Sequence, residues 1–516
     1  MTDELFERKV RRDLRRLADE LPVPTPSRIA QRERSLPAIR SRRSRWSRRH
    51  RPGYGHRPGH RRSPGARYQH AGYRQHPAGE QRAAWRGMLP VAALVAAVAA
   101  MLLAAVAVVP GHLLRSHAVR LGNELPTAAL TQFPGALAYV ADGALHAAEP
   151  GASPRSVASV ANPVSGPQWS SDSRWLAYAG SSGHLHVVST DGAANTIVTP
   201  NPVAAFAWSP RANLLAVLPA SGSQAGDLLL VHVGGGTATA ALVASGVWSF
   251  VWSSGGREIA YSKAGAGNQS DRLFLYDVVT GGRQLLPYVP PPGTGVLLGS
   301  FWPDGGGLVM WVDPGRSIAA EATGLELVSL PLAASLPLPL VRTFVYLPWL
   351  AWSPGGSRLL TVQMSKASPW EGSNLVVCRP SRGSCQVLPQ PRHVVTVDPA
   401  WSPGGRRIAF VRASAMASLT PGVGLDWWYA TRRLWVAMAD GTGAREVTGA
   451  GQGVAEPRFG ASGKSIFYVT AHSVKVVPAA GGRATTVAGG LSGALGTGGP
   501  DGYGKLPWGG LAEWGP

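Results

Sequence analysis

Short runs of alternating apolar and polar residues recur after residue 135, and each ends in an aromatic residue followed by a turn. Alternation of this kind predicts β-strands with one buried face, and Pro, Gly and Ser between the runs predict tight reversals. The unit is seen in PQWSSDSRWLAYA at 167–179, AFAWSPRANLLAVL at 205–218, FVWSSGGREIAYS at 250–262, SFWPDGGGLVMWV at 300–312, LAWSPGGSRLLTV at 350–362, PAWSPGGRRIAFV at 399–411 and, more weakly, PRFGASGKSIFYV at 457–469.

The aromatic landmarks of these units are spaced 39, 44, 50, 50, 49 and 58 residues apart. Repeats of this length built from short strands are typical of β-propellers, in which each repeat is a four-stranded antiparallel blade. These signature aromatics, which we expect to pack between neighbouring blades, are Trp169, Trp208, Trp252, Trp302, Trp352, Trp401, Phe459 and, in an incomplete copy, Trp514.

The two ends of the repeat region look complementary. Residues 136–160 read as the second to fourth strands of a blade, and LAEWGP at 511–516 reads as a first strand alone. Joined, they make one blade, which removes two open sheet edges and closes the ring. The sequence therefore predicts an all-β propeller over 135–516 with eight blades, or seven if one unit is degenerate.

An uncharged stretch precedes the propeller. MLPVAALVAAVAAMLLAAVAVVP at 88–110 is almost entirely Ala, Val, Leu and Met, and its 23 residues suffice to cross a bilayer as a helix. Trp85 and Arg86 stand at its N-terminal edge, where an aromatic and a cation favour the membrane interface. We expect an uncleaved transmembrane helix, followed by a linker at 111–134.

Basic residues are concentrated before that stretch. Residues 1–87 contain 23 Lys and Arg against 8 Asp and Glu, which accounts for most of the formal net charge of +21. By the positive-inside rule, the N-terminus stays in the cytoplasm and the propeller is exported. Because the charge lies in a tail beside a membrane segment, no specific nucleic-acid partner is expected.

Two segments make up the tail. Residues 1–21 carry an apolar stripe at helical spacing among arginines, which predicts an amphipathic helix that binds inner-leaflet lipid or a cytoplasmic partner. Residues 22–87 are rich in Arg, His, Pro and Gly, and so predict a disordered linker.

The W-S-P-x-G-x-x-I-A-F pattern, clearest in PAWSPGGRRIAFV, resembles the repeat of TolB-type propellers, which are WD40-like. A membrane-tethered propeller is also similar, more distantly, to LpqB-type envelope lipoproteins, although this chain has no lipobox cysteine and a transmembrane helix would anchor it. The same repeat occurs in the propellers of dipeptidyl-peptidase-like hydrolases. The resemblance implies a fold, and function has to be argued from a site.

Cys378 and Cys385 flank a short connector between two strand-like runs. A hairpin would bring them opposite each other, so a disulfide in an oxidising compartment is one reading and a pair of free thiols is the other.

Blade geometry assigns the connections to two faces. The turn face carries the turns between strands one and two and between strands three and four. The loop face carries the connections between strands two and three and between blades, including 366–373 and 412–431 and, between blades, 331–347. Aromatic residues that look exposed gather in these loops, and the candidate binding face comprises Trp370, Asp426, Trp427, Trp428 and Tyr429.

Catalytic and metal-binding motifs are missing from the sequence. It contains no G-x-S-x-G, H-E-x-x-H, Walker or EF-hand pattern, so no catalytic, cofactor or metal residue is assigned. The sequence thus predicts a single-pass cell-envelope protein, not an enzyme, whose exported propeller binds, senses or scaffolds a protein, peptide or glycan. The alternative is a hydrolase or lyase with ionisable residues converging at the loop face.

Overall fold

The computed structural model describes the propeller region and not the N-terminal part of the chain. The described residues are 135–149, 152–160, 165–220, 225–234, 237–266, 269–316, 324–366, 370–416, 425–449, 451, 453–491 and 512–515. The segments expected at 1–21, 22–87, 88–110 and 111–134 lie outside them. Within the described part, no helix is long and apolar enough to cross a membrane.

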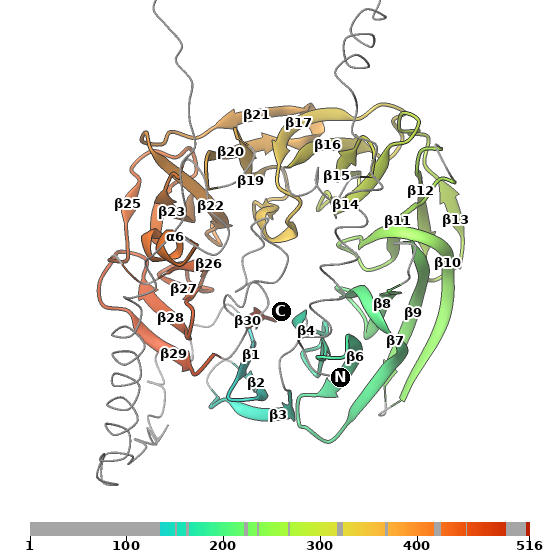
Figure 1. Cartoon of the computed structure of the whole chain (residues 1–516), viewed down its shortest axis with the longest axis horizontal. Coiled ribbons are helices and arrows are strands. Elements are labelled where there is room, and N and C mark those ends of the chain that lie inside the picture. Colours follow the sequence, from blue (N-terminus) through green and yellow to red (C-terminus); the bar gives the residue numbers. More distant parts are fainter. Residues whose placement is uncertain are drawn as a thin grey trace, which may run out of the picture. The chain divides into compact units, whose positions relative to one another are not determined.

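Antiparallel sheets account for nearly all of the described secondary structure, as predicted. Figure 1 shows them arranged around a common centre, with the first strand of each sheet innermost. From the centre outward, the four-stranded sheets comprise β30 (Ala512–Trp514), β1 (Leu137–Ala141), β2 (Ala144–Ala148) and β3 (Arg155–Ser159); β14 (Gly295–Phe301), β15 (Gly307–Asp313), β16 (Leu325–Pro331) and β17 (Leu338–Thr343); β18 (Ala351–Trp352), β19 (Leu359–Met364), β20 (Ser373–Arg379) and β21 (Ser384–Val387); β22 (Val394–Trp401), β23 (Arg407–Ser414), β24 (Arg433–Met438) and β25 (Arg445–Glu446); and β26 (Ala455–Phe459), β27 (Ser465–Val469), β28 (Ser473–Pro478) and β29 (Thr485–Gly489).

A ten-stranded sheet holds the remaining strands. In spatial order it comprises β4 (Ser165–Trp169), β5 (Trp175–Ala179), β6 (His184–Ser189), β7 (Asn195–Trp208), β8 (Leu214–Pro219), β9 (Gly226–Gly234), β10 (Thr237–Trp252), β11 (Glu258–Lys263), β12 (Arg272–Asp277) and β13 (Arg283–Leu285). The first part of β7 pairs with β6 and its last part with β8, and β10 divides in the same way between β9 and β11. The repeats ending at Trp208 and Trp252 are the shortest, so the strand continues from one repeat into the next with no intervening loop.

The first and last described strands pair with each other. In the antiparallel register of β1 and β30, Leu137 lies opposite Trp514 and Tyr139 opposite Ala512. The N–H of Gly515 also donates to the carbonyl of Ala136 at 2.7 Å. A segment near residue 137 and one near residue 514 thus complete one four-stranded sheet.

Signature tryptophans link successive repeats. The indole N–H donates to an oxygen atom on the inner strand of the preceding repeat: Trp208 to Gln168 O (3.1 Å), Trp252 to Ala207 O (3.0 Å), Trp352 to Ser300 Oγ (2.9 Å), Trp401 to Ala351 O (2.9 Å) and, across the terminal pairing, Trp169 to Glu513 O (3.3 Å). Trp302 differs, because it donates to Ser329 Oγ within its own sheet. A buried indole needs such an acceptor, and here the acceptor joins neighbouring sheets.

One expected connection is wrong. Residues 331–347 do not simply link two blades, because they contain β17, the outer strand of the sheet that begins with β14. The Pro-rich sequence was read as a loop, but a proline such as Pro339 is compatible with an edge strand, which has no outer neighbour to accept its missing N–H. The link to the next sheet is shorter and contains the 3₁₀ turn η1 (Leu347–Trp349).

Candidate functional site

The loop face between β18 and β30 carries a network of buried polar residues that meets the inner strands. It begins at α6 (Leu425–Thr431), a short helix in the connection between β23 and β24. Trp428 Nε1 donates to the carbonyl of Ser414 at 3.1 Å, which holds α6 against the end of β23.

Two of the aromatics expected to be exposed are buried, and that expectation is wrong. Trp370 is 7% exposed and Trp428 is 2% exposed, and both pack on Val395 and Ala413. Their rings meet edge to face, with centroids 6.4 Å apart. The two connections fold onto each other, so their large apolar side chains form a local core in place of a docking surface.

The other members of the candidate binding face do not complete it. Tyr429 is half-buried, and its ring lies 5.6 Å from that of Trp428. Asp426 and Trp427 belong to α6, but their side chains lie outside the described part of the structure. The proposed five-residue surface is therefore not assembled as expected.

Arg432 connects α6 to the inner strand β22. Its side chain is fully buried and forms an ion pair with Asp398, whose side chain is 2% exposed. The guanidinium also donates from Nε to the carbonyl of Val454 at 2.7 Å and lies over the Trp428 ring, 5.1 Å from its centroid. A buried charge requires such compensation, so this arginine holds the helix, β22 and β26 together.

Asp398 also organises the adjoining repeat. Its second carboxylate oxygen accepts from Trp349 Nε1 at 2.8 Å, and its first accepts from the N–H of Glu456 at 3.2 Å. Glu456 in turn accepts a hydrogen bond from the hydroxyl of Tyr346 at 3.1 Å. These contacts join η1, β22 and β26 near the loop-face ends of the inner strands.

Glu456 is the most perturbed carboxyl of this network. Burial, reinforced by the negative charge of Asp398, raises the pKa of Glu456 to about 8. Burial also raises the pKa of Glu513 on β30, while Arg458 opposes that shift. The pKa of the Tyr346 hydroxyl is raised well above its ordinary value by its burial and by the nearby carboxyls. Glu456 is therefore largely protonated at neutral pH and able to donate a hydrogen bond.

The backbone explains why these side chains converge. Asp398 and Glu456 each stand three residues before a signature aromatic, and Trp349 occupies the same position in its own repeat. Both acidic residues have positive φ, 50° and 47°, and lie where the register with the second strand shifts. Bulges of this kind re-aim side chains, and backbone strain in non-glycine residues is a feature of functional sites.

Sequence reasoning did not identify Asp398, Arg432, Glu456 or Glu513. A usable signal was present in VDPAW and AEPRF, where an acidic residue and a proline precede the signature aromatic in two consecutive repeats. Arg432 has no comparable signal, because its role depends on the fold of the 412–431 connection.

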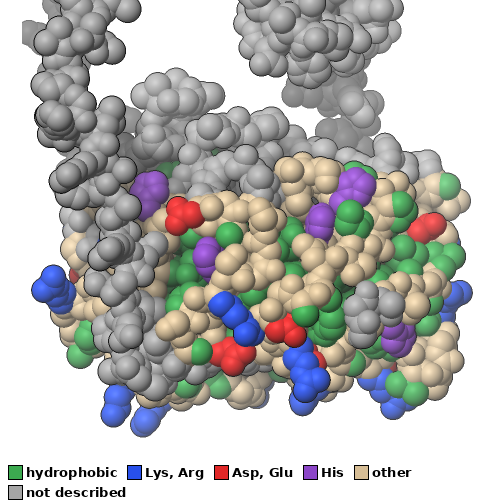
Figure 2. Space-filling model, turned by 90° about the horizontal axis from the view of Figure 1, so that it is seen from below, with side chains coloured by type: hydrophobic (Ala, Val, Ile, Leu, Met, Phe, Trp, Pro, Cys, Tyr) green, Lys and Arg blue, Asp and Glu red, His purple; other side chains and the backbone are tan. Residues whose placement is uncertain are grey.

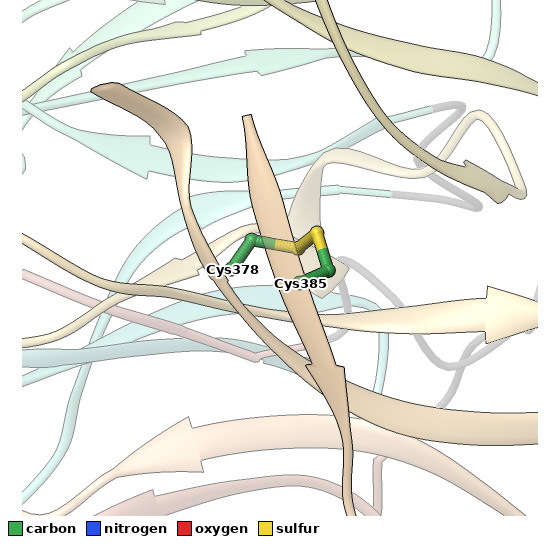
Figure 3. The surroundings of a disulfide bond; sticks show 2 residues. All are labelled: Cys378 and Cys385. Atoms are coloured by element: carbon green, nitrogen blue, oxygen red, sulfur yellow. A yellow bond between two sulfur atoms is a disulfide. The ribbon is translucent and has the colours of Figure 1, made fainter. Parts of the chain in front are cut away.

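No group of three or more His, Cys, Asp or Glu side chains in the described residues is placed to hold a metal ion. The cysteines lie elsewhere, on β20 and β21. They face each other across the strand pair and form a disulfide, with Cα atoms 4.0 Å apart (Figure 3).

Comparisons with known proteins bear on the fold. No family model matches the chain, and no curated protein matches its sequence. Among solved structures it is similar to TolB from Acinetobacter baumannii, at 16% identity and a TM-score of 0.34, over 64% of this chain and 67% of that one. A putative TolB from Agrobacterium tumefaciens matches at 16% identity and a TM-score of 0.28, over 49% and 87%.

A structure from a study of two prolyl endopeptidases is similar at 11% identity and a TM-score of 0.42, over 78% of this chain and 55% of that one. The TolB structures agree with the resemblance drawn from the repeat. At such identities these are likenesses of fold, and the strand pairings carry the description of the architecture given above.

Proposed function

We propose that the chain is a membrane-anchored β-propeller of eight blades, exported from the cytoplasm, that binds a protein partner at its loop face. Five four-stranded sheets, together with a ten-stranded sheet in which β7 and β10 each belong to two groups of four, support the blade number. The apolar stretch at 88–110 and the basic tail before it support the anchor and its orientation. The disulfide suits an oxidising compartment.

The half-buried carboxyl of Glu456 carries the binding proposal. It is held by Tyr346, lies beside the charge of Asp398 and is one blade away from Glu513. Arg458, on the same inner strand, is exposed. Perturbed carboxyls on a rigid scaffold mark functional sites, and a partner that brings a cationic or hydrogen-bonding group can be recognised there.

Photo-crosslinking tests the binding site. A benzophenone amino acid replaces Arg458 in the full chain, or replaces the exposed turn-face residue Arg257 as a matched control, and cells are irradiated. We expect a discrete adduct from position 458 that disappears when Glu456→Gln is added. Equal adducts from both positions would contradict the proposal.

Protease treatment of intact cells tests the orientation separately. Cleavage after residue 115 with protection of residues 1–87 is expected. Protection of the propeller in intact cells would refute export, whatever the result of the crosslinking.

The convergence of Glu456 and Glu513 also favours a second candidate, a hydrolase or lyase. A carboxyl protonated near neutral pH is suited to general acid catalysis. Turnover of fluorogenic glycosides or esters that is lost in Glu456→Gln would support this candidate, and no turnover of either class by the full chain would count against it.

A further inference from the structure

A groove opens on the turn face, on the opposite side from Glu456, between the sheet of β18–β21 and the sheet of β22–β25. Its volume is about 530 Å³, within the range of ligand-binding clefts. One wall is the hairpin of β20 and β21, and the other is the turn that follows β24 at residues 438–440.

The floor of the groove is apolar. It consists of Val377, Leu388 and Met438, with Cys385 beside them. Met438 is 47% exposed, a high value for a large apolar side chain. Its flexible thioether can adapt to an incoming apolar group.

Three arginines surround this floor and oppose a single carboxylate. Arg379 and Arg406 are exposed, and neither forms an ion pair with any of the described residues. Arg358 is positioned by stacking over Trp401, 4.7 Å from the ring centroid, and by donating to the carbonyl of Gly405 at 3.2 Å.

The one acidic residue of the groove is already engaged. Asp440 accepts hydrogen bonds from the N–H and the hydroxyl of Thr442 at 2.9 and 2.7 Å, which lowers the pKa of its carboxyl. The groove therefore presents a net positive rim around an apolar floor.

Basic residues extend beyond the groove on this side of the blades. The turns after the signature aromatics carry Arg174, Arg211, Arg257, Arg406 and Lys464. In the edge-on view of Figure 2, Lys and Arg side chains lie mostly toward one rim and histidines mostly toward the other. Such a surface attracts anionic partners before contact is made.

The disulfide holds one arginine of the rim in place. Arg379 directly follows Cys378 and lies opposite Ser384, next to Cys385 (Figure 3). The connector between the strands is the short turn η2 (Pro380–Arg382), which ends at Gly383 in the left-handed conformation with φ of 60°. A covalently closed hairpin presents Arg379 with little freedom to lose on binding.

We propose that this groove binds an acidic segment of a partner protein. Asp or Glu side chains of the segment pair with Arg379 and Arg406, and an apolar side chain between them packs on Leu388 and Met438. A peptide supplies both kinds of group, whereas a phosphate or an anionic glycan offers nothing to the apolar floor. The groove lies on the turn face, so the proposal stands independently of a site at Glu456.

Fluorescence anisotropy tests this proposal on the full chain in non-ionic detergent. The probes are a fluorescein-labelled octapeptide of alternating Glu and Leu, and the same peptide with Gln in place of Glu. We expect the Glu peptide to bind more tightly, and the double variant Arg379→Gln/Arg406→Gln to weaken it about tenfold, since charge-assisted hydrogen bonds are lost. Binding should also weaken as salt is raised.

The matched control is Arg382→Gln, which removes an exposed arginine from η2 outside the groove and should leave the affinity unchanged. The proposal fails if the Glu and Gln peptides bind alike, or if Arg382→Gln weakens binding as much as the double variant. It also fails if polyphosphate of equal charge displaces the Glu peptide as well as unlabelled peptide does. Thermal melts confirm that each variant is folded before its affinity is compared.

Discussion

Replacing Asp398 by Asn tests the central role of the buried ion pair. Asparagine has nearly the same shape and tolerates the positive φ of this position, so backbone strain does not change. The amide oxygen can still accept from Trp349. The negative charge opposite Arg432 is lost, and a fully buried guanidinium is left without its compensating carboxylate.

Breaking a buried pair by removing one member costs about 3–5 kcal/mol, because the other charge remains in the low-dielectric interior. The matched control is Arg257→Gln, which breaks an ion pair of 2.8 Å with Asp277 whose arginine side chain is 66% exposed. Exposed pairs contribute roughly 0–1 kcal/mol. The burial of the two arginines thus predicts a several-fold difference between the variants.

Urea unfolding of the full chain in detergent, followed by tryptophan fluorescence, measures both free energies. The double variant Asp398→Asn/Arg432→Met should recover much of the loss, since no uncompensated charge remains buried. If Asp398→Asn changed stability no more than Arg257→Gln, the ion pair would not be a structural link between α6 and the inner strands.

Three further predictions concern other features of the propeller. The raised pKa of Glu456 means that the folded state retains a proton which the unfolded state releases from about pH 4.5, so stability should fall as pH rises toward 8, by at most about 1.4 kcal/mol per pH unit. Thermal melts from pH 5 to pH 8 should show that Glu456→Gln removes this slope, and parallel profiles would contradict the assignment. Gly307→Ala should destabilise the fold by about 1–3 kcal/mol, because a Cβ there would lie 2.6 Å from the Cδ2 of its own repeat's tryptophan, whereas Gly404→Ala, with open space around it, should be nearly neutral in the same urea titration. Replacing both Cys378 and Cys385 by Ser should lower stability by about 2–3 kcal/mol, as expected for a short closed loop, and an unchanged urea midpoint would show that the hairpin needs no cross-link.

Much of the architecture follows from the sequence because each repeat states its own local structure. The Trp-Ser turn and the apolar run after it place the first two strands of a blade, as in β22 and β23. The pairing of cysteines across β20 and β21 can be anticipated for the same reason, since a hairpin is a local structure.

The site is harder to predict because it depends on contacts between repeats. Trp370 and Trp428 look exposed when each loop is considered alone, and only the packing of one loop on the other buries them. Asp398 and Glu456 converge because they share a position relative to the aromatic of successive blades, a relation visible only once the blades are stacked around an axis. The membrane span at 88–110 stays a prediction.

The pairing of β30 with β1 has a consequence for the order of biosynthesis. The strand that completes the first sheet is encoded some 370 codons after its neighbour, so that sheet has an open inner edge until residues 512–514 have left the ribosome. Every earlier intermediate is an arc with an unsatisfied margin, exposed to chaperones and proteases. A premature stop codon just before position 512 would therefore spare almost all of the propeller and still yield a product marked for degradation.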